Sequence, residues 1–432
     1  MSLKFFVVKK LLSLLFIFCA IGISRAQETS LDYFFSKALK NNDSLFNLVN
    51  LKKIGQLQQQ MIIAQNRLPQ VDALADIVFA PYFNNNGKVI DISTNPSNNA
   101  FGYDAGISNG GLYAAQLKVT QQLFNRAITD NILFQNKVQN QGLSLTYEEV
   151  YHNLKNNITR IYLTAYGYQL QEELNQNLLT DLEKRLKIIG ILVKNGILLQ
   201  SDYLLVQVNL DQTKIQLQQV RNDLRESLRQ LYSISTAPLN QNVTLSFPGL
   251  TIMPKKEGFF FEKIFVNDSL RVEANLKGFN NKYKPKVSAF VDGGLNAVQI
   301  PNIYHKIGAS AGLQFTLPIY DGHQRKINAQ QNALRKETLL NSRKNSEITK
   351  KNDLQSLINQ ISAQGENLNL MEQQLKKQDI LMRLYKEKLV KGQVSVIDYL
   401  NVVQNYKMQE NARIQMQTNL WLLQNQYNYI NW

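Results

Sequence analysis

Hydrophobic residues follow two different periods along this chain, and the succession of periods occurs twice. Apolar and polar positions alternate from Val71 to about residue 80 and again from Tyr113 to Leu123, which predicts two strands of about 10 residues each. A helical period then continues as far as Asn195, which would make a helix roughly 100 Å long. Helices of that length are unusual in globular domains and indicate an extended helical structure.

The second half of the chain repeats this succession. Strands are predicted from Val287 and from Ile307, and a long helix from about Arg325 to Lys391. Apolar residues also recur every seven positions along the helices, as in coiled coils. These positions are Tyr203, Leu210, Leu217, Leu224 and Leu231 in the first half, and Leu354, Ile361, Leu368, Leu375, Met382 and Leu389 in the second. Repetition on this scale predicts one architecture built twice.

A short motif with one glycine and one aspartate follows each of the two long helices. It reads LVKNGILLQSDYLLVQ from Leu192 and LVKGQVSVIDYLNVVQ from Leu389, 196 positions later. Glycine adopts the left-handed conformation at helix C-termini, and aspartate accepts hydrogen bonds from free amides at helix N-termini. We therefore expect a tight helical hairpin in each half, with one helix ending at the glycine and the next beginning at the aspartate. The residues concerned are Gly196, Gly392, Asp202 and Asp398.

The remaining segments suggest how the chain is divided. A single helix is expected from Ser30 to Arg67, before Pro69, and an exposed loop rich in Asn, Ser and Gly from Phe83 to Gly111. Near the start, basic residues precede an apolar run of about 12 residues and Ser24-Arg25-Ala26, which predicts a signal peptide too short to span a membrane. The predicted divisions are a signal peptide at 1–26, a first repeat at 27–235, a connector at 236–265 and a second repeat at 266–432.

Charge and chemistry then exclude several function classes. The formal charge of +15 would become +11 without residues 1–26, which hold four basic residues and no acid. Lysines and arginines are spread among Gln and Asn along the helices, so we expect no nucleic acid partner. The single cysteine, Cys19, lies in the predicted signal peptide. His152, His305 and His323 are scattered and no catalytic motif is present, so we expect no metal, no cofactor and no enzymatic activity.

The four strands have the length and the alternation that a transmembrane β-barrel requires, with one face toward lipid and the other toward water. Four strands cannot close a barrel alone, and an open sheet edge in lipid would leave backbone groups unpaired. Other subunits must therefore complete the barrel. Alternating strands also occur in soluble sheets. The residues expected to face lipid include Val71, Ala73, Leu117, Val119, Val287, Ala289, Leu313 and Phe315.

The chain resembles the TolC-like outer-membrane efflux proteins, or outer membrane factors, over nearly all of the sequence after residue 26. The most specific elements are the turns GILLQSDYL and GQVSVIDYL, and the strand-to-helix joints KVTQQLFN and QFTLPIYDG. The resemblance implies a mainly α fold with a small β part and an internal duplication. It further implies that coiled-coil hairpins form an α-barrel, and that four strands per chain enter a 12-stranded transmembrane β-barrel in a homotrimer.

The same resemblance implies a passive channel subunit of a tripartite efflux or type I secretion system. Such a subunit lies in outer-membrane lipid with a large periplasmic part and works with a periplasmic adaptor protein and an inner-membrane pump. The turns at Gly196 and Gly392 would then form the periplasmic tip, with Asp202 and Asp398 at its aperture, where they act in ion passage or only as helix caps. The alternative is a soluble periplasmic coiled-coil adaptor or structural protein.

One departure from the family pattern concerns the gate. Some gated members hold the tip closed with a tyrosine and an arginine beside the glycine of the second repeat. Leu389 and Val394 occupy those positions in this chain. A polar latch of that particular kind is therefore not expected.

Overall fold

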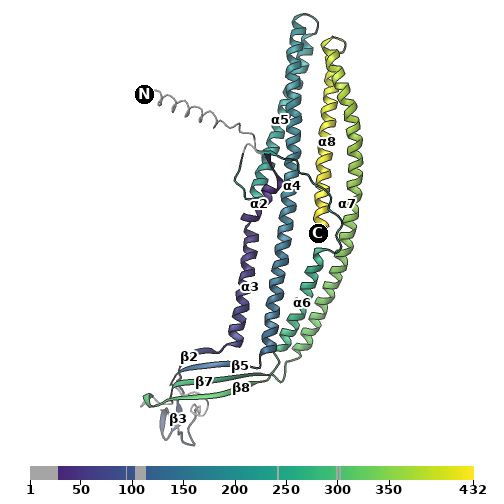
Figure 1. The fold of residues 1–432 in the computed structure, drawn as a ribbon. Coiled ribbons are helices and arrows are strands. Elements are labelled where there is room, and N and C mark those ends of the chain that lie inside the picture. The colour runs from purple at the N-terminus through teal and green to yellow at the C-terminus, as the bar shows by residue number, and fades with distance from the viewer. Residues whose placement is uncertain (1–27, 94, 103–112, 241–242, 298–299, 301–302) are drawn as a thin grey trace, which may run out of the picture. The chain divides into compact units, whose positions relative to one another are not determined.

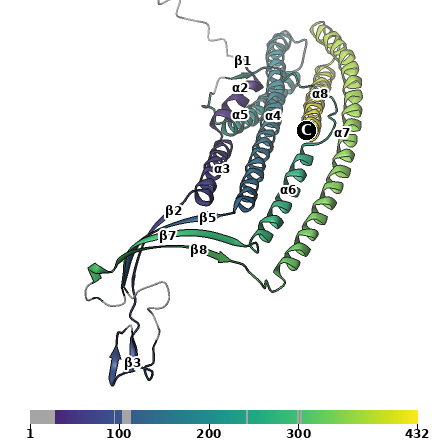
Figure 2. The same ribbon diagram turned by 60° about the horizontal axis from the view of Figure 1, so that its bottom comes forward.

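The structure, a computed structural model, describes residues 28–93, 95–102, 113–240, 243–297, 300 and 303–432. The predicted signal peptide lies outside the described residues. The chain forms two compact units (Figures 1 and 2). We call Asn47–Tyr147 with Phe260–Asn345 the sheet unit, and Met1–Phe46 with Glu148–Phe259 and Ser346–Trp432 the hairpin unit.

Four antiparallel strands make up the main sheet of the sheet unit, and all four were predicted. They are β2 (Gln70–Ile77), β5 (Tyr113–Leu123), β7 (Lys286–Ala297) and β8 (Ile307–Thr316). Their order is β2-β5-β7-β8, so the strand pairs of the two repeats lie next to each other. Among the residues that the structure describes, strands β2 and β8 each have a neighbouring strand on one side only. The sheet therefore ends in two open edges.

The strand register separates an apolar face from a polar face. In one row across the sheet Val71 pairs with Val119, Val119 with Val291, and Val291 with Ala311. Paired residues lie on the same face and successive residues on opposite faces. All eight residues expected to face lipid share the face of this row. The next row, on the opposite face, consists of Asp72, Lys118, Asp292 and Ser310.

Each strand continues into a helix at the same end of the sheet. α3 (Asp43–Arg67) leads into β2, and α4 (Arg126–Lys194) follows β5. α6 (Phe260–Asn281) leads into β7, and α7 (Gln324–Val390) follows β8. The parts of these helices within the sheet unit run side by side in the order α3, α4, α6, α7 (Figure 2).

Two expectations for the first repeat were wrong. The single helix expected from Ser30 to Arg67 is two helices, α2 (Leu31–Asn41) and α3. Asn42 has an extended backbone with ψ of 116°, and its side-chain oxygen accepts from Leu45 N (3.0 Å), so it ends one helix and caps the next. The expected exposed loop contains a hairpin of β3 (Tyr82–Asn85) and β4 (Lys88–Asp91).

The β3–β4 hairpin was missed because its two strands have only four residues each, too few to show a clear alternation of apolar and polar residues. Asn84, Asn86 and Gly87 take positive φ values of 57°, 52° and 85°, which Asn and Gly tolerate. The side chain of Asn85 donates a 2.6 Å hydrogen bond to Asp91. This bond closes the short hairpin on itself. In the second repeat the connection between β7 and β8 contains only the 3₁₀ turn η1 (Ile303–His305) among its described residues.

The hairpin unit contains two helical hairpins, formed by α4 with α5 (Gln200–Ile234) and by α7 with α8 (Val396–Ile430). The predicted seven-residue repeat of the second half forms a buried seam, in which every member is at most 9% exposed. Members of the first-half repeat, among them Leu210, Leu217 and Leu231, are buried as well. Burial of these side chains provides the main stabilisation of the hairpins.

A small parallel sheet in the hairpin unit was not expected. β1 (Glu28–Thr29) pairs with β6 (Thr244–Leu245), which lies in the predicted connector. The hydroxyl of the buried Tyr162 donates to Ser246 O (2.6 Å), and Gln169 bonds both backbone groups of Leu245. These contacts attach the connector to α4. Helix α6 begins at Phe260, within the segment predicted as connector, and the domain boundaries themselves stay a prediction.

Candidate functional site

The two hairpin turns have the same backbone. Gly196 N donates to Val193 O (3.0 Å) and Ile197 N to Leu192 O (2.9 Å) at the end of α4. At the end of α7 the same two bonds run from Gly392 to Leu389 (3.0 Å) and from Gln393 to Lys388 (2.9 Å). The glycine φ values are 71° and 68°. Both turns are therefore Schellman motifs, which a left-handed residue permits.

The helices that follow begin differently from what the sequence suggested. Both aspartates were predicted as possible N-caps, but the N-caps are Leu199 and Ser395. Asp202 and Asp398 occupy the third helical position, and this corrects the prediction. The Asp202 carboxylate accepts from Leu199 N (3.1 Å), and Ser395 Oγ accepts from Asp398 N (3.0 Å) and donates to its carboxylate (2.6 Å). Each aspartate still stabilises a helix start, from inside the first turn.

A tyrosine next to the second aspartate links the two hairpins. Tyr399 is completely buried, and its hydroxyl donates to Asp181 Oδ2 on α4 (3.1 Å). Lys386 Nζ lies 3.0 Å from the same oxygen, and Arg185 lies 3.8 Å from Asp181 Oδ1. Burial, followed by the neighbouring Asp181 charge, raises the pKa of Tyr399 well above its ordinary value. We call Asp181, Arg185, Lys386 and Tyr399 the Asp181 cluster.

Sequence reasoning missed the Asp181 cluster, because its members are far apart in the sequence. Asp181 and Tyr399 are separated by 218 positions, and nothing in the local pattern pairs them. The signal that could have found it is the Tyr after each aspartate, since a tyrosine hydroxyl in a packed seam needs a polar partner. Lys407 was missed for the same reason. It is buried against Thr213 and Gln216 of α5, and burial lowers its pKa.

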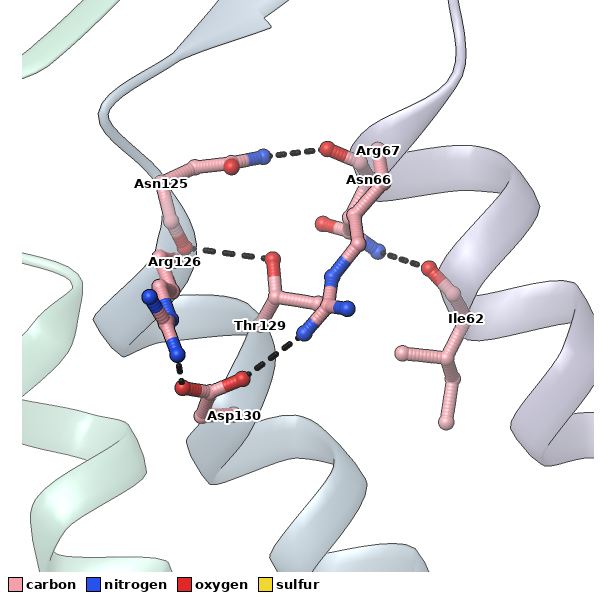
Figure 3. A network of polar contacts seen from close by, with 7 residues as sticks. All are labelled: Ile62, Asn66, Arg67, Asn125, Arg126, Thr129 and Asp130. Carbon is pink, nitrogen blue, oxygen red and sulfur yellow. Dashed lines mark hydrogen bonds and ion pairs between the residues drawn. The ribbon is translucent and has the colours of Figure 1, made fainter.

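The joint between β5 and α4 is fixed by polar contacts to α3 (Figure 3). Asn125 donates from its side chain to Asn66 O, next to the end of α3. Arg67 reaches from the last residue of α3 to Asp130 Oδ1 (2.8 Å), and Arg126 lies 3.7 Å from Asp130 Oδ2. These bonds tie the last turn of α3 to the first turn of α4. Asn125, the last residue of the predicted joint motif, therefore provides one of the contacts that hold this joint together.

The corresponding joint between β8 and α7 uses a different set of polar side chains. Asp321 accepts from Arg325 Nε (2.6 Å) and from His323 N (3.0 Å), and Arg325 also lies over the ring of Tyr283. Gly322 and His323 have positive φ values of 57° and 64°. The Asp321 carboxylate also accepts from Arg325 N (3.4 Å), so it caps an amide in the first turn of α7.

Neither a metal centre nor a spanning helix is found in the part of the chain that the structure describes. No group of three or more His, Cys, Asp or Glu residues could hold a metal ion there. Within the same ranges, no helix is long and apolar enough to cross a membrane. His152 is stacked between Tyr429 and Trp432 near the C-terminus, and burial lowers its pKa. It therefore packs as an aromatic residue.

The comparisons with known proteins agree with this arrangement. Residues 282–426 match the family described as outer membrane efflux protein, and this confirms the family resemblance for that part of the chain. The proteins of that family are channels and not enzymes, in agreement with the sequence-based expectation. No curated protein matches the chain significantly.

Solved structures of outer-membrane proteins share the fold. The outer membrane protein VceC from Vibrio cholerae has a TM-score of 0.70 at 11% identity, covering 93% of this chain and 95% of its own. The CmeC outer membrane channel from Campylobacter jejuni gives 0.71 at 14%, covering 93% and 85%. The MtrE outer membrane channel from Neisseria gonorrhoeae gives 0.65 at 14%, covering 93% and 88%. At such identities these likenesses establish the fold.

Proposed function

We propose that this chain is the subunit of a trimeric outer-membrane channel, which acts as a passive conduit in a tripartite efflux or type I secretion system. In this proposal three copies place their four-stranded sheets in one 12-stranded barrel across the outer membrane. Their helices form an α-barrel in the periplasm. The match of residues 282–426 to outer membrane efflux proteins supports the class of protein.

The observation that carries the proposal is a sheet with one apolar face and two open edges. Leu313 and Phe315 on the apolar face are 73% and 64% exposed, although a water-soluble protein would cover such side chains. Each unpaired backbone group at an open edge would cost several kcal/mol in lipid. Pairing β2 of one copy with β8 of the next would remove the open edges, and lipid around the closed barrel would cover the apolar face. The 8 to 12 residues of each strand suit a tilted span of a bilayer.

Aromatic residues at both ends of the sheet support a membrane position. Phe124 and Tyr320, at the end joined to helices, are 90% and 79% exposed. Phe79 and Tyr304, at the other end, are exposed as well. Outer-membrane barrels carry aromatic residues at both membrane surfaces, because these rings have an apolar body and tolerate the polar interface.

The helices beside the open edges support assembly from several copies. α3 precedes β2 and exposes Ile54, Leu57 and Met61 on one side. α7 follows β8 and exposes Ile327 and Leu334, seven positions apart. Spacings of three, four and seven place residues on one helical face. Contact between α3 of one copy and α7 of the next would bury both apolar faces at the same edges that the strands leave open.

The hairpin turns would form the periplasmic entrance of this channel. There a periplasmic adaptor protein and an inner-membrane pump would dock, and Asp202 and Asp398 would lie at the aperture. Their place in the first helical turn supports a structural role. Asp398 is also exposed and Asp202 half-buried, so the Asp398 carboxylate in particular remains open to passing ions. Ion conductance measured over a range of salt concentrations in Asp398→Asn and in the wild type separates the two roles. A changed conductance supports a role in ion passage, and an unchanged conductance supports a structural role.

Fractionation tests the proposal against its alternative, a soluble periplasmic coiled-coil adaptor or structural protein. We expect the protein in the outer-membrane fraction, extracted only by detergent, with a particle mass of three copies. A protein that stays in solution without detergent, or that is monomeric in detergent, would exclude the channel. Co-purification then tests the partners, since a docked adaptor and pump should be retained after mild crosslinking.

A further inference from the structure

A pocket lies in the sheet unit, where helices α4, α6 and α7 meet the first residue of β7. It has a volume of about 480 Å³, which is within the range of sites for small molecules. Its walls come from residues 128–135 of α4, 275–281 of α6 and 328–335 of α7, together with Lys282, just after α6, and Lys286. The residues that matter for the inference are three cations and three asparagines.

The charge of the pocket is entirely positive. Lys282, Lys286 and Arg335 line it, and none of the lining residues is acidic. Lys282 also lies over the ring of Phe279, with 5.3 Å between Nζ and the ring centroid. No ion pair of these three cations is found among the described residues. The pocket therefore offers positive charge with no carboxylate on its walls to neutralise it, which favours an anion as the ligand.

The floor of the pocket is polar and incompletely hydrogen-bonded. Asn131, Asn281 and Asn332 are each more than nine-tenths buried. The Nδ2 atoms of Asn131 and Asn332 donate to the backbone oxygens of Ala274 (3.4 Å) and Asn328 (2.7 Å). These bonds leave Oδ1 of Asn131, Oδ1 of Asn332 and Nδ2 of Asn281 without partners. Buried amide atoms without partners are costly, so polar ligands or water are expected beside them.

A glycine brings the two walls together. Gly278 on α6 faces α4, and a Cβ at this position would lie 2.3 Å from Gln135 Nε2 and 3.1 Å from Asn131 Nδ2. The absence of a side chain lets the amides of α4 reach α6, where Gln135 donates to Ala274 O (2.9 Å). The polar wall of the pocket therefore depends on Gly278.

We propose that this pocket binds a phosphate group. Arginine and lysine side chains together suit phosphate, which offers several strong acceptor oxygens and up to two negative charges. The pocket is larger than phosphate alone needs, so it also has room for part of the molecule that carries the phosphate. Two sources have this chemistry, free inorganic phosphate and the headgroup of a phospholipid.

The position of the pocket favours the lipid headgroup, and this step rests on the proposed function. Lys286 is the first residue of β7, at the sheet end that continues into helices. If the sheet spans the outer membrane, this end lies at the periplasmic surface of the bilayer, where phospholipid phosphates are located. The phosphate chemistry itself does not depend on that placement.

Calorimetric titration of the purified full-length protein, in a detergent without phosphate, tests the proposal. The probes are inorganic phosphate and the short-chain lipid dihexanoylphosphatidylglycerol, with dihexanoylglycerol as a ligand that lacks phosphate. The variants are Lys282→Gln, and Lys286→Gln combined with Arg335→Gln. The control is Lys277→Gln, an exposed lysine of α6 outside the pocket.

We expect at least one phosphate-bearing probe to bind the wild type and the control equally, and dihexanoylglycerol not to bind. The double variant should bind at least tenfold more weakly, and Lys282→Gln at least threefold more weakly. Binding of the lipid alone assigns the source as a headgroup, and binding of both probes assigns a general phosphate site. No binding of either probe, or equal binding by control and pocket variants, overturns the proposal.

The titration and the fractionation together separate this inference from the proposed function. A protein that binds phosphate but fractionates as a soluble monomer would keep the pocket and exclude the channel. A trimeric membrane protein that binds neither probe would exclude the pocket and leave the channel proposal unaffected. The Lys282 side chain is exposed and makes no described hydrogen bond, so Lys282→Gln should fold normally. This single variant therefore still tests the pocket if the double variant fails to fold.

Discussion

The two hairpin turns share a backbone but differ in what their side chains contact. Gly196 and Gly392 end their helices with the same pair of hydrogen bonds. Tyr399 in the second copy is buried and bonded to Asp181, whereas Tyr203 in the first copy is only partly buried and packs near Gly190. An internal duplication thus preserved the geometry of the turn, while one copy acquired a polar contact to the other hairpin.

The sheet shows the opposite relation, since both strand pairs supply the same apolar face. The largest predicted effect tests this equivalence. Val119→Arg in β5 and Leu313→Arg in β8 should both impair insertion, at about 2–4 kcal/mol near the bilayer midplane. Thr120→Arg and Gln314→Arg, on the opposite face, should insert nearly normally. The measurement is the yield of trimer in outer membranes, and equal losses on both faces would contradict the assignment.

The Asp181 cluster should matter more than its counterpart in the second repeat. Asp181→Asn removes the charge that pairs with Lys386 and accepts from Tyr399, and should destabilise the hairpin unit by about 2 kcal/mol. The equivalent position, Lys377, is exposed, and Lys377→Gln should change little. Urea unfolding in detergent measures both. Similar losses in the two variants would mean that the hairpins do not depend on this contact.

The two turn glycines should respond alike, because their surroundings are alike. Nothing lies within 4 Å of a Cβ added at Gly196 or Gly392, so an alanine meets no steric obstacle there. The positive φ alone should cost about 1 kcal/mol at each turn. Amide hydrogen exchange in the last turns of α4 and α7 reports this local loss. If alanine destabilised only one of the two turns, the two turns would not have equivalent backbone conformations.

The helix starts after the turns should respond differently. Ser395→Ala removes the side-chain cap of α8 and should cost about 1 kcal/mol. Leu199 provides no side-chain cap to α5, so Leu199→Ala should leave that helix start unchanged. Hydrogen exchange over the first turns of α5 and α8 distinguishes them. Equal increases in exchange at the two helix starts, in Ser395→Ala and in Leu199→Ala, would contradict the expected difference in capping between α5 and α8.

The smallest effect concerns pH. The raised pKa of Tyr399 means that the folded protein holds this proton more tightly than the unfolded chain does. The contribution of Tyr399 to the free energy of unfolding is therefore fully present well below pH 10, the ordinary pKa of tyrosine in the unfolded chain. It is lost as the pH rises above that value. At pH 10 the wild type should already have lost about 0.4 kcal/mol relative to neutral pH through this group. Tyr399→Phe should lack that component in unfolding measured from pH 8 to 10.

Periodicity predicted the elements with strong local signals. β5 was expected from Tyr113 to Leu123 and has those bounds, and the seven-residue seam of α7 is buried throughout. These features follow from side-chain spacing alone. The helix break at Asn42 was missed, because asparagine is tolerated within helices and caps them only when a new helix begins beside it.

Contacts between distant segments were not predictable from one sequence. The β1–β6 pair joins two short segments whose own patterns indicate no strand, and Tyr162 and Gln169 stabilise it from α4. The aspartates of the turns were expected at the N-cap, but the chain places Leu199 and Ser395 there. Residue type indicated that a helix starts nearby, while the exact register depended on how the turn closes.

The most direct test of the channel is which way successive residues of β8 face. The only cysteine of the sequence, Cys19, lies in the predicted signal peptide, so single cysteines can be spin-labelled in the purified protein. In bilayers, labels at Leu313→Cys and Phe315→Cys should collide more often with oxygen, which dissolves in lipid, than with a water-soluble nickel complex. Labels at Gln314→Cys and Thr316→Cys should show the reverse. The same high accessibility to the nickel complex at all four positions would contradict a sheet that spans the membrane.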